Sequence, residues 1–280
     1  MIALDDGRAR LMISPELGGS ILRYVFRGRD VLRPAAEDVR DPLETACFSL
    51  VPFANRIAQG AFVWNGRTIR LPRNFGDHPH VLHGHGWQAM WRVISHIGPH
   101  ALLRYEHAAG DWPWTYVAEQ SFDLVDGALH AALSVRSASG EPMPASLGFH
   151  PYFPRQAGTR LTTQVQGVWL SNDSCIPTRL AGPAHFFDLA NGAAMAPLVD
   201  HCHTGWNGEA LIEQEGLRVH LSAPNCTFLH IYAPVDGDCF CAEPVTAMPD
   251  AMNRPREISG LRALAAGETF SIRMVIAPQA

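Results

Sequence analysis

The chain has 280 residues, of which 47% are hydrophobic and 18% are charged, and its formal net charge is −5 at pH 7. These values predict a globular protein that can bury a sizeable core, with no sign of nucleic acid or a membrane as a partner. All 22 basic residues are arginine, which excludes catalysis through a Schiff-base lysine and excludes a P-loop lysine.

Alternating apolar residues on both sides of tight turns predict three β-hairpins in chain order. Their expected turns are Asn65-Gly66, Asp126-Gly127 and a turn near Gly216. Asn-Gly and Asp-Gly suit these turns because both central residues need a positive φ. Two further strands are expected near the C-terminus, at residues 227–234 and 269–277.

The sequence shows no convincing amphipathic helix, no linker and no internal repeat. It therefore predicts a single all-β domain spanning residues 1–280, built as a sandwich or a barrel-like pair of sheets. The six cysteines form no paired metal motif, and no signal peptide is evident, so we expect free thiols in a cytoplasmic protein. No apolar run approaches the roughly 18 residues of a membrane helix.

The stretch "HPHVLHGHGW", residues 78–87, contains His78, His80, His83 and His85. On a strand, two histidines separated by one residue share a face, as in many β-barrel metal sites. A proline and two glycines in the same stretch weaken a regular strand. The residues alone leave three alternatives open, namely a metal site, a sugar or phosphate pocket, and a histidine-rich loop.

Several other polar residues stand in apolar or aromatic segments: Arg56, His150, Asp200, His201, His203 and Glu243. Each alone is more typical of a satisfied core or surface group. Together, aromatic side chains and hydroxyl-binding polar groups suit a sugar, which has apolar faces and a polar rim. A carboxylate and a histidine in a partly desolvated site suit general base and general acid.

Five segments in the same order resemble the aldose 1-epimerase (galactose mutarotase) family, and they span most of the chain. They are "NRIAQGAFVWNG" at 55–66, "LHGHGWQ" at 82–88, "GFHPYFP" at 148–154, "VDHCHTGWNG" at 199–208 and "CAEP" at 241–244. The resemblance implies a large antiparallel β-sandwich, the galactose mutarotase-like supersandwich. It also implies an isomerase that interconverts the α and β anomers of a free aldose, with no metal and no other cofactor.

The resemblance also implies a role for five residues. Glu243 corresponds to the general base toward the anomeric hydroxyl, and His150 corresponds to the general acid toward the ring oxygen. Arg56, His83 and Asp200 correspond to residues that bind the sugar. The expected partner is therefore a small-molecule sugar, bound by a monomer or a homodimer.

The sequence departs from the family pattern at three histidines. His85 stands where many members have glycine, His203 stands where an aromatic residue is common, and His230 lies close to the position of a frequent glutamine. Three alternatives to a free-aldose epimerase remain open. They are a hexose-6-phosphate mutarotase using Arg70 and Arg73, a non-catalytic sugar-binding protein, and a metal-dependent isomerase.

Overall fold

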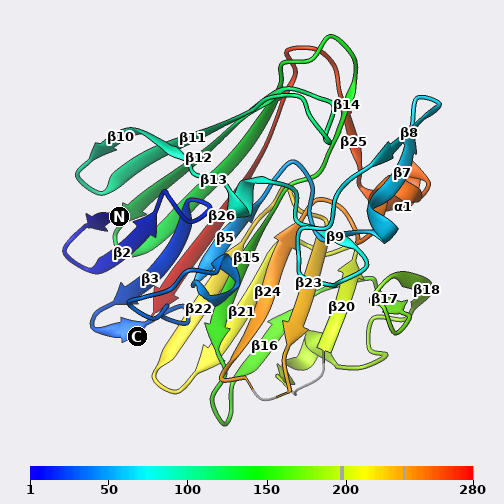
Figure 1. Ribbon diagram of the computed structural model, residues 1–280. Helices are drawn as coiled ribbons and strands as arrows, with labels where there is room; N and C mark the ends of the chain where they lie inside the picture. The colour runs from blue at the N-terminus through cyan, green and yellow to red at the C-terminus, as the bar shows by residue number, and fades with distance from the viewer. Residues whose placement is uncertain (196–198, 236, 280) are drawn as a thin grey trace.

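Two large antiparallel sheets dominate the structure, a computed structural model that describes residues 1–195, 199–235 and 237–279 (Figure 1). The three predicted hairpins are confirmed. Asn65 and Gly66 have φ values of 49° and 78°, and Asp126 and Gly127 have φ values of 53° and 91°, as these tight turns require. The third hairpin turns at Gly216, which has a φ of 68°.

Within the described residues, the first sheet contains eleven strands. Ten of them follow one another across the sheet, and β4 (Arg29–Asp30) pairs only with β3. The order across the sheet is β1 (Ile2–Asp5), β2 (Ala9–Ser14), β3 (Ser20–Phe26), β5 (Cys47–Leu50), β15 (Gly148–Pro154), β24 (Cys239–Val245), β23 (Phe228–Ala233), β20 (Val199–Thr204), β17 (Gly167–Ser171) and β18 (Pro177–Ala181).

The second sheet contains nine strands in the part of the chain that the structure describes. Its order is β10 (Arg92–Ile97), β11 (His100–His107), β12 (Tyr116–Val125), β13 (Ala128–Ser137), β26 (Thr269–Gln279), β22 (Leu217–Ser222), β21 (Glu209–Gln214), β16 (Arg160–Thr163) and β19 (Ala193–Ala194). The expected strands at 227–234 and 269–277 are β23 and β26.

Three two-stranded sheets complete the strands of the described ranges: β6 (Arg56–Ile57) with β9 (Val81–Leu82), β7 (Ala61–Trp64) with β8 (Arg67–Arg70), and β14 (Met143–Ala145) with β25 (Arg262–Leu264). Helices are short: α1 (Arg256–Ser259) and 3-10 turns at Pro42–Glu44, Ala58–Gly60, Gly86–Gln88, Leu189–Asn191 and Ala251–Asn253. None of the helices in the described ranges has the length and hydropathy of a membrane span. All six thiols are free, as expected.

The core lies between the two large sheets, and strand periodicity creates it. In β12 every second residue from Tyr116 to Leu124 is buried, while the residues between them are partly exposed. Such alternation is the pattern of a sheet with one face on the core. The all-β antiparallel sandwich that the sequence predicts is therefore confirmed.

The centre of the first sheet differs, because its strands are buried on both faces. All seven residues of β24 are buried, as are the first six residues of β15. One face packs on the core, and the segment from Val51 to Trp91, which includes β6 and β9, covers part of the other (Figure 1). Polar side chains on this covered face are thus removed from bulk water.

Close backbone contacts at Gly84 hold the covering segment against its own first residue, Val51, which directly follows β5. The backbone N–H groups of His85 and Gly86 both donate to the carbonyl of Val51, each at 3.0 Å. Gly84 has a φ of 72°, and a Cβ atom there would lie 2.3 Å from the oxygen of Val51. Only glycine fits this approach, which also positions the neighbouring His83.

We predict that Gly84→Ala lowers the free energy of unfolding by about 2 to 5 kcal/mol, from the left-handed backbone and from backbone overlap together. Gly66→Ala is the matched control, because Gly66 has a φ of 78° and a Cβ there would meet nothing within 4 Å. The control should lose only about 1 to 2 kcal/mol. Urea unfolding measures the free energy of unfolding of both variants. Equal losses of stability would contradict the close contact between Gly84 and the backbone of Val51.

Candidate active site

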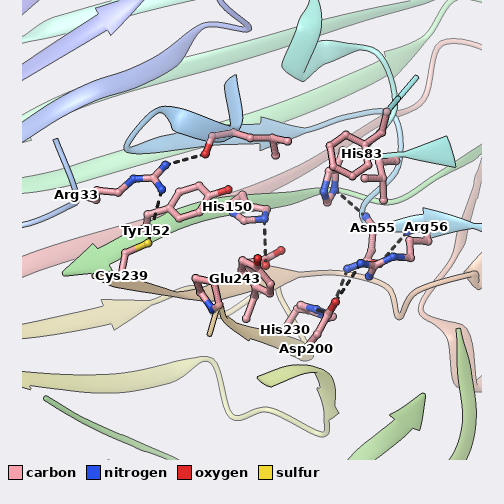
Figure 2. A pocket seen from close by; sticks show the side chains of 15 residues that line it. Arg33, Asn55, Arg56, His83, His150, Tyr152, Asp200, His230, Cys239 and Glu243 are labelled. Carbon is pink, nitrogen blue, oxygen red and sulfur yellow. Dashed lines mark hydrogen bonds and ion pairs between the residues drawn. The ribbon is translucent and has the colours of Figure 1, made fainter. Parts of the chain in front are cut away.

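A pocket of about 270 Å³ opens over the centre of the first sheet, beneath the covering segment. All five residues that the family resemblance assigns to the site line this pocket: Arg56, His83, His150, Asp200 and Glu243. Figure 2 shows their side chains converging from the sheet and from the covering segment. The structure therefore brings together residues that lie as many as 187 positions apart in the sequence (Arg56 to Glu243).

Strand register places three of the polar side chains in one row. His230 on β23 pairs directly with Glu243 on β24. On the other side of β24, His150 lies between the pairs Gly148↔Val245 and Tyr152↔Cys241, so it lies opposite Glu243 as well. Because paired residues of antiparallel strands point to the same face, all three enter the pocket.

Glu243 and His150 form a close pair at the floor of the pocket. Nε2 of His150 lies 3.3 Å from Oε1 of Glu243, and the two side chains are 7% and 1% exposed. The His150 ring stacks against both Phe48 and Tyr152, with centroid distances of 4.6 and 4.8 Å. Nδ1 of His150 and Oε2 of Glu243 are buried without a hydrogen-bond partner in the described structure. Nε2 and Oε1 are the two atoms through which the pair is in contact.

Burial favours the uncharged form of both members of this pair. It raises the pKa of Glu243 to about 7, although the charge of His230 acts in the opposite direction. It lowers the pKa of His150 to about 3, and the nearby His230 lowers it further. From the sequence, either burial or a nearby carboxylate could have the larger effect on the pKa of His150. In the structure the effect of burial is larger. Below about pH 7 the pair therefore holds one proton, and burial favours its position on Glu243.

His83 reaches the pocket as a neutral donor. Its backbone N–H donates to the carbonyl of Asn55 at 2.9 Å, and its Nδ1 accepts from the backbone N–H of Asn55 at 3.2 Å. Since Nδ1 is an acceptor, the ring proton sits on Nε2. Burial lowers the pKa of His83 well below its usual value, and His150 lowers it further. Nε2–H is then available to donate to a hydroxyl oxygen.

Four side chains form a closed ring of contacts beside the acid–base pair. Nη2 of Arg56 donates to Oδ2 of Asp200 at 3.0 Å, and Nη1 of Arg56 lies 3.2 Å from Oδ1 of Asn55. Nε2 of His230 lies 2.7 Å from Oδ1 of Asp200, and Nδ1 of His230 lies 3.4 Å from Nδ2 of Asn55. We call these four residues the polar ring (Figure 2).

Opposing influences act on the protonation of His230. The Asn55 amide is oriented by Arg56, so Nδ2 of Asn55 faces Nδ1 of His230 and can donate to it when the imidazole is neutral. Burial and the carboxylates of Glu243 and Asp200 act in opposite directions on the pKa of His230, with a net rise, whereas the Asn55 contact favours the neutral ring. Burial raises the pKa of Asp200, but His230 and Arg56 outweigh it and hold that pKa below its usual range.

The sequence analysis did not assign a binding or catalytic role to Asn55 or to His230. The sequence signal for His230 was its place near a glutamine of the family pattern, and Asn55 directly precedes the assigned arginine. Arg33 and Tyr152 also line the pocket, and the sequence analysis did not predict them as site residues. The Arg33 guanidinium lies over the Tyr152 ring at 3.9 Å and donates to the carbonyls of two residues near the 3-10 turn Pro42–Glu44.

The remaining histidines of residues 78–85 lie outside the pocket lining. Nδ1 of His80 accepts from the backbone of Gln59, and His78 contacts the His80 backbone, so both are hydrogen-bonded loop residues. His85 stacks on His107 with a centroid distance of 4.5 Å. His203 is buried elsewhere on β20. Of the four histidines in this stretch, His83 is the one that lines the pocket.

The arginines considered for a phosphate, Arg70 and Arg73, are both exposed and do not line the pocket. The two arginines that do line it, Arg33 and Arg56, already donate to protein carbonyls or to Asp200. The geometry does not favour a phosphosugar.

One group of three possible metal ligands occurs within the described residues, namely His150, Cys241 and Glu243, with ligand atoms within 4.8 Å of one another. A metal would need the thiolate of Cys241. Burial, together with the Glu243 carboxylate, raises the pKa of that thiol well above its usual value. The same ion would also occupy both members of the acid–base pair. The donor set therefore suits proton transfer better than metal binding.

Comparisons with known proteins identify the family of this chain. The sequence profile of the family described as aldose 1-epimerase matches residues 1–277. The uncharacterized protein YphB of Escherichia coli K12 is 34% identical over 284 residues, which covers 97% of this chain and 96% of that protein.

Two solved structures show the shared architecture. A candidate aldose 1-epimerase from Escherichia coli K12 is 33% identical with a TM-score of 0.91, covering 99% of this chain and 98% of that chain. A galactose mutarotase-like protein from Clostridium acetobutylicum is 21% identical with a TM-score of 0.87, covering 99% and 94%. By its full-length match and its fold, this chain belongs to the aldose 1-epimerase family.

Proposed function

We propose that this protein is an aldose 1-epimerase that interconverts the α and β anomers of a free sugar. The observation that carries the proposal is the buried pair of Glu243 and His150, whose reactive atoms lie 3.3 Å apart in a pocket lined by hydroxyl-binding groups. A sugar-binding protein without activity has no use for a desolvated acid and base in contact, since desolvation of such groups is unfavourable.

Ring opening needs one proton to leave O1 and another to arrive at O5. Glu243 takes the proton from O1 while His150 gives a proton to O5. The C1–O5 bond breaks, C1 and O1 become an aldehyde, and the C1–C2 bond rotates. Reclosure reverses the proton transfers on the other face of the aldehyde. The pair holds one proton before and after each step, so protons balance without a cofactor.

The pair reaches its reactive form by an internal proton shift. In the empty pocket the shared proton is on Glu243, because burial favours the uncharged forms of both groups. Transfer from Oε1 to Nε2 over 3.3 Å produces the carboxylate and the imidazolium. Both forms carry the same total charge, so the shift needs no proton from solvent.

The other pocket residues hold the sugar while C1 changes its configuration. Nε2–H of His83 donates, and Arg56 and Asp200 offer further hydrogen bonds from the polar ring. The polar ring fixes these groups before a sugar arrives, so little side-chain entropy is lost on binding. Only the bond between C1 and C2 then remains free to turn.

Polarimetry on freshly dissolved aldoses tests the function directly. The protein should speed the decay of optical rotation of at least one unphosphorylated aldose toward its equilibrium value. Sugar binding without any acceleration would instead establish the non-catalytic alternative. A preference above about tenfold for a 6-phosphate, or about 1.4 kcal/mol, would establish the phosphosugar alternative.

We predict that Glu243→Gln and His150→Gln each lower kcat by about 10²- to 10⁴-fold, the usual contribution of a positioned acid or base. Both changes keep approximate size and remove the proton chemistry. The double variant should lose far less than the product of the single losses, because the two groups act as a unit. A single variant that stays folded by circular dichroism and keeps more than about a tenth of the activity would refute that residue's role.

The shared proton predicts a bell-shaped dependence of kcat/KM on pH. As the pH falls toward about 3, His150 gains a second proton, and the pair loses its internal acceptor. As the pH rises through about 7, Glu243 loses the shared proton, and the pair loses its donor. Activity should therefore fall on the alkaline side of neutrality, and the limbs report the pair's macroscopic pKa values. Activity that increases steadily above pH 7 would rule out this proton count.

The polar ring predicts a difference between two substitutions of His230. Gln has one donor and one acceptor and can replace both contacts, so His230→Gln should change kcat/KM by less than about threefold. Leu leaves Asp200 and Asn55 each with an unpaired buried atom, so His230→Leu should lower kcat/KM by about 10- to 100-fold, mainly through KM. Steady-state kinetics of both variants test this difference. Equally small losses of kcat/KM in the two variants would show that the contacts of His230 in the polar ring are unimportant.

A further inference from the structure

His85 lies two residues after His83, across the turn at Gly84, and its ring contacts the second sheet. It stacks on His107 of β11 with a centroid distance of 4.5 Å and an interplanar angle of 23°. The His107 ring in turn stacks on Tyr116, its partner on β12, at 4.8 Å and 18°. The turn that carries His83 is therefore joined to the second sheet through the ring of His85.

The backbone of His83 needs such support. Its φ is 57°, in the left-handed region that residues with a Cβ rarely adopt. A conformation of this kind is unfavourable and persists only where the surroundings hold it. On one side, the backbone of Asn55 contacts the N–H and Nδ1 of His83 (Figure 2). On the other side, the bonds to Val51 lie within the covering segment itself, so the ring of His85 adds a contact with a separate sheet.

Hydrogen bonding at the stack fits two uncharged imidazoles. Nε2 of His107 faces the carbonyl of Trp112 at 3.3 Å and therefore carries the proton, which leaves Nδ1 to accept from the hydroxyl of Tyr105 at 3.2 Å. Nδ1 of His85 is buried without a hydrogen-bond partner in the described structure. A proton on that nitrogen would be a buried donor without an acceptor, which is unfavourable.

Acid opposes the stack. Burial lowers the pKa of His85 to about 4, and His107 lowers it further, whereas the exposed carboxylate of Asp111 acts in the opposite direction. Burial also lowers the pKa of His107, and it raises the pKa values of Tyr105 and Tyr116, which stay uncharged. Since both imidazole values lie below the ordinary value of 6.5, the uncharged stack is complete above about pH 6.5 and is lost as the pH falls through about 4.

We propose that His85 is a positioning residue for sugar binding. Its uncharged ring, stacked on His107, keeps His83 in the left-handed conformation that directs Nε2–H into the pocket. Protonation of the stacked imidazoles separates the rings, draws His85 toward Asp111 and loosens His83, so acid weakens sugar binding. This inference rests on the proposed function, in which His83 donates to a sugar hydroxyl.

His85→Ala removes the ring and keeps a residue that fits the backbone, whose φ is −108° and ψ is −29°. Because His83 contributes to binding and not to proton transfer, this variant should raise KM about tenfold and leave kcat within about threefold. Polarimetry at about pH 7 measures both constants, with the most rapidly converted aldose among D-glucose, D-galactose, D-xylose and L-arabinose. A KM within about twofold of the wild-type value would overturn the proposal. His220→Ala is the matched control, since His220 is exposed on β22 and should leave both constants unchanged.

His85→Phe keeps an aromatic ring for the stack and cannot be protonated. At about pH 7 its KM should lie within about threefold of the wild-type value. About half of the His85 rings are charged at about pH 4, so the wild-type KM should rise about twofold between pH 6.5 and pH 4. The Phe variant should lack this rise. A wild-type KM that does not rise, or an equal rise in the Phe variant, would overturn the proposal, and this comparison decides it if His85→Ala does not fold.

Amide hydrogen exchange separates this inference from the proposed function, because it needs no catalysis. The N–H groups of His85 and Gly86 both donate to Val51, and they should exchange about tenfold faster in His85→Ala but at the wild-type rate in His85→Phe. A protein that accelerates mutarotation but shows equal exchange in all variants retains the function and loses the positioning role. A protein without epimerase activity that shows the expected order of exchange retains the positioning of His83 and loses the function. Failure of both measurements rejects both proposals.

Discussion

The register of four neighbouring strands is the constraint on which the site depends. Glu243 faces the pocket because Ala242, next to it on β24, faces the core, and Phe149 and Ile231 face the core in the same way from β15 and β23. A slip of one residue would exchange the two faces and put an alanine in place of the carboxylate. The packing of apolar side chains between the sheets therefore also sets the position of the acid–base chemistry.

The buried polar groups of this pocket differ in whether their atoms have hydrogen-bond partners. In the polar ring, the side chains of Asn55, Arg56, Asp200 and His230 contact one another in a closed circuit, which joins the covering segment to the sheet and leaves only Nε of Arg56 buried without a partner in the described structure. In the acid–base pair, one atom of each side chain is buried without a partner. Satisfied networks rigidify a site, whereas unsatisfied groups are a reservoir of strain that is common where chemistry occurs.

The fold alone does not define the substrate, because relatives with about a fifth of their residues identical share nearly the whole architecture. Strand β23 carries two residues at the edge of the pocket. His230 lies close to the position of a frequent glutamine in the family pattern, and Tyr232, two residues later, lines both the pocket and a neighbouring hollow.

The sequence by itself determined the three hairpins, two strands near the C-terminus, the all-β class and the family, since alternation and turn residues act locally and the family segments keep their order. Ordered motifs also identified the five expected pocket residues. The tertiary structure alone decided that burial keeps His150 uncharged and that His230 closes the polar ring. These outcomes depend on contacts such as that between Asn55 and His230, 175 positions apart, and on desolvation, which no local pattern encodes.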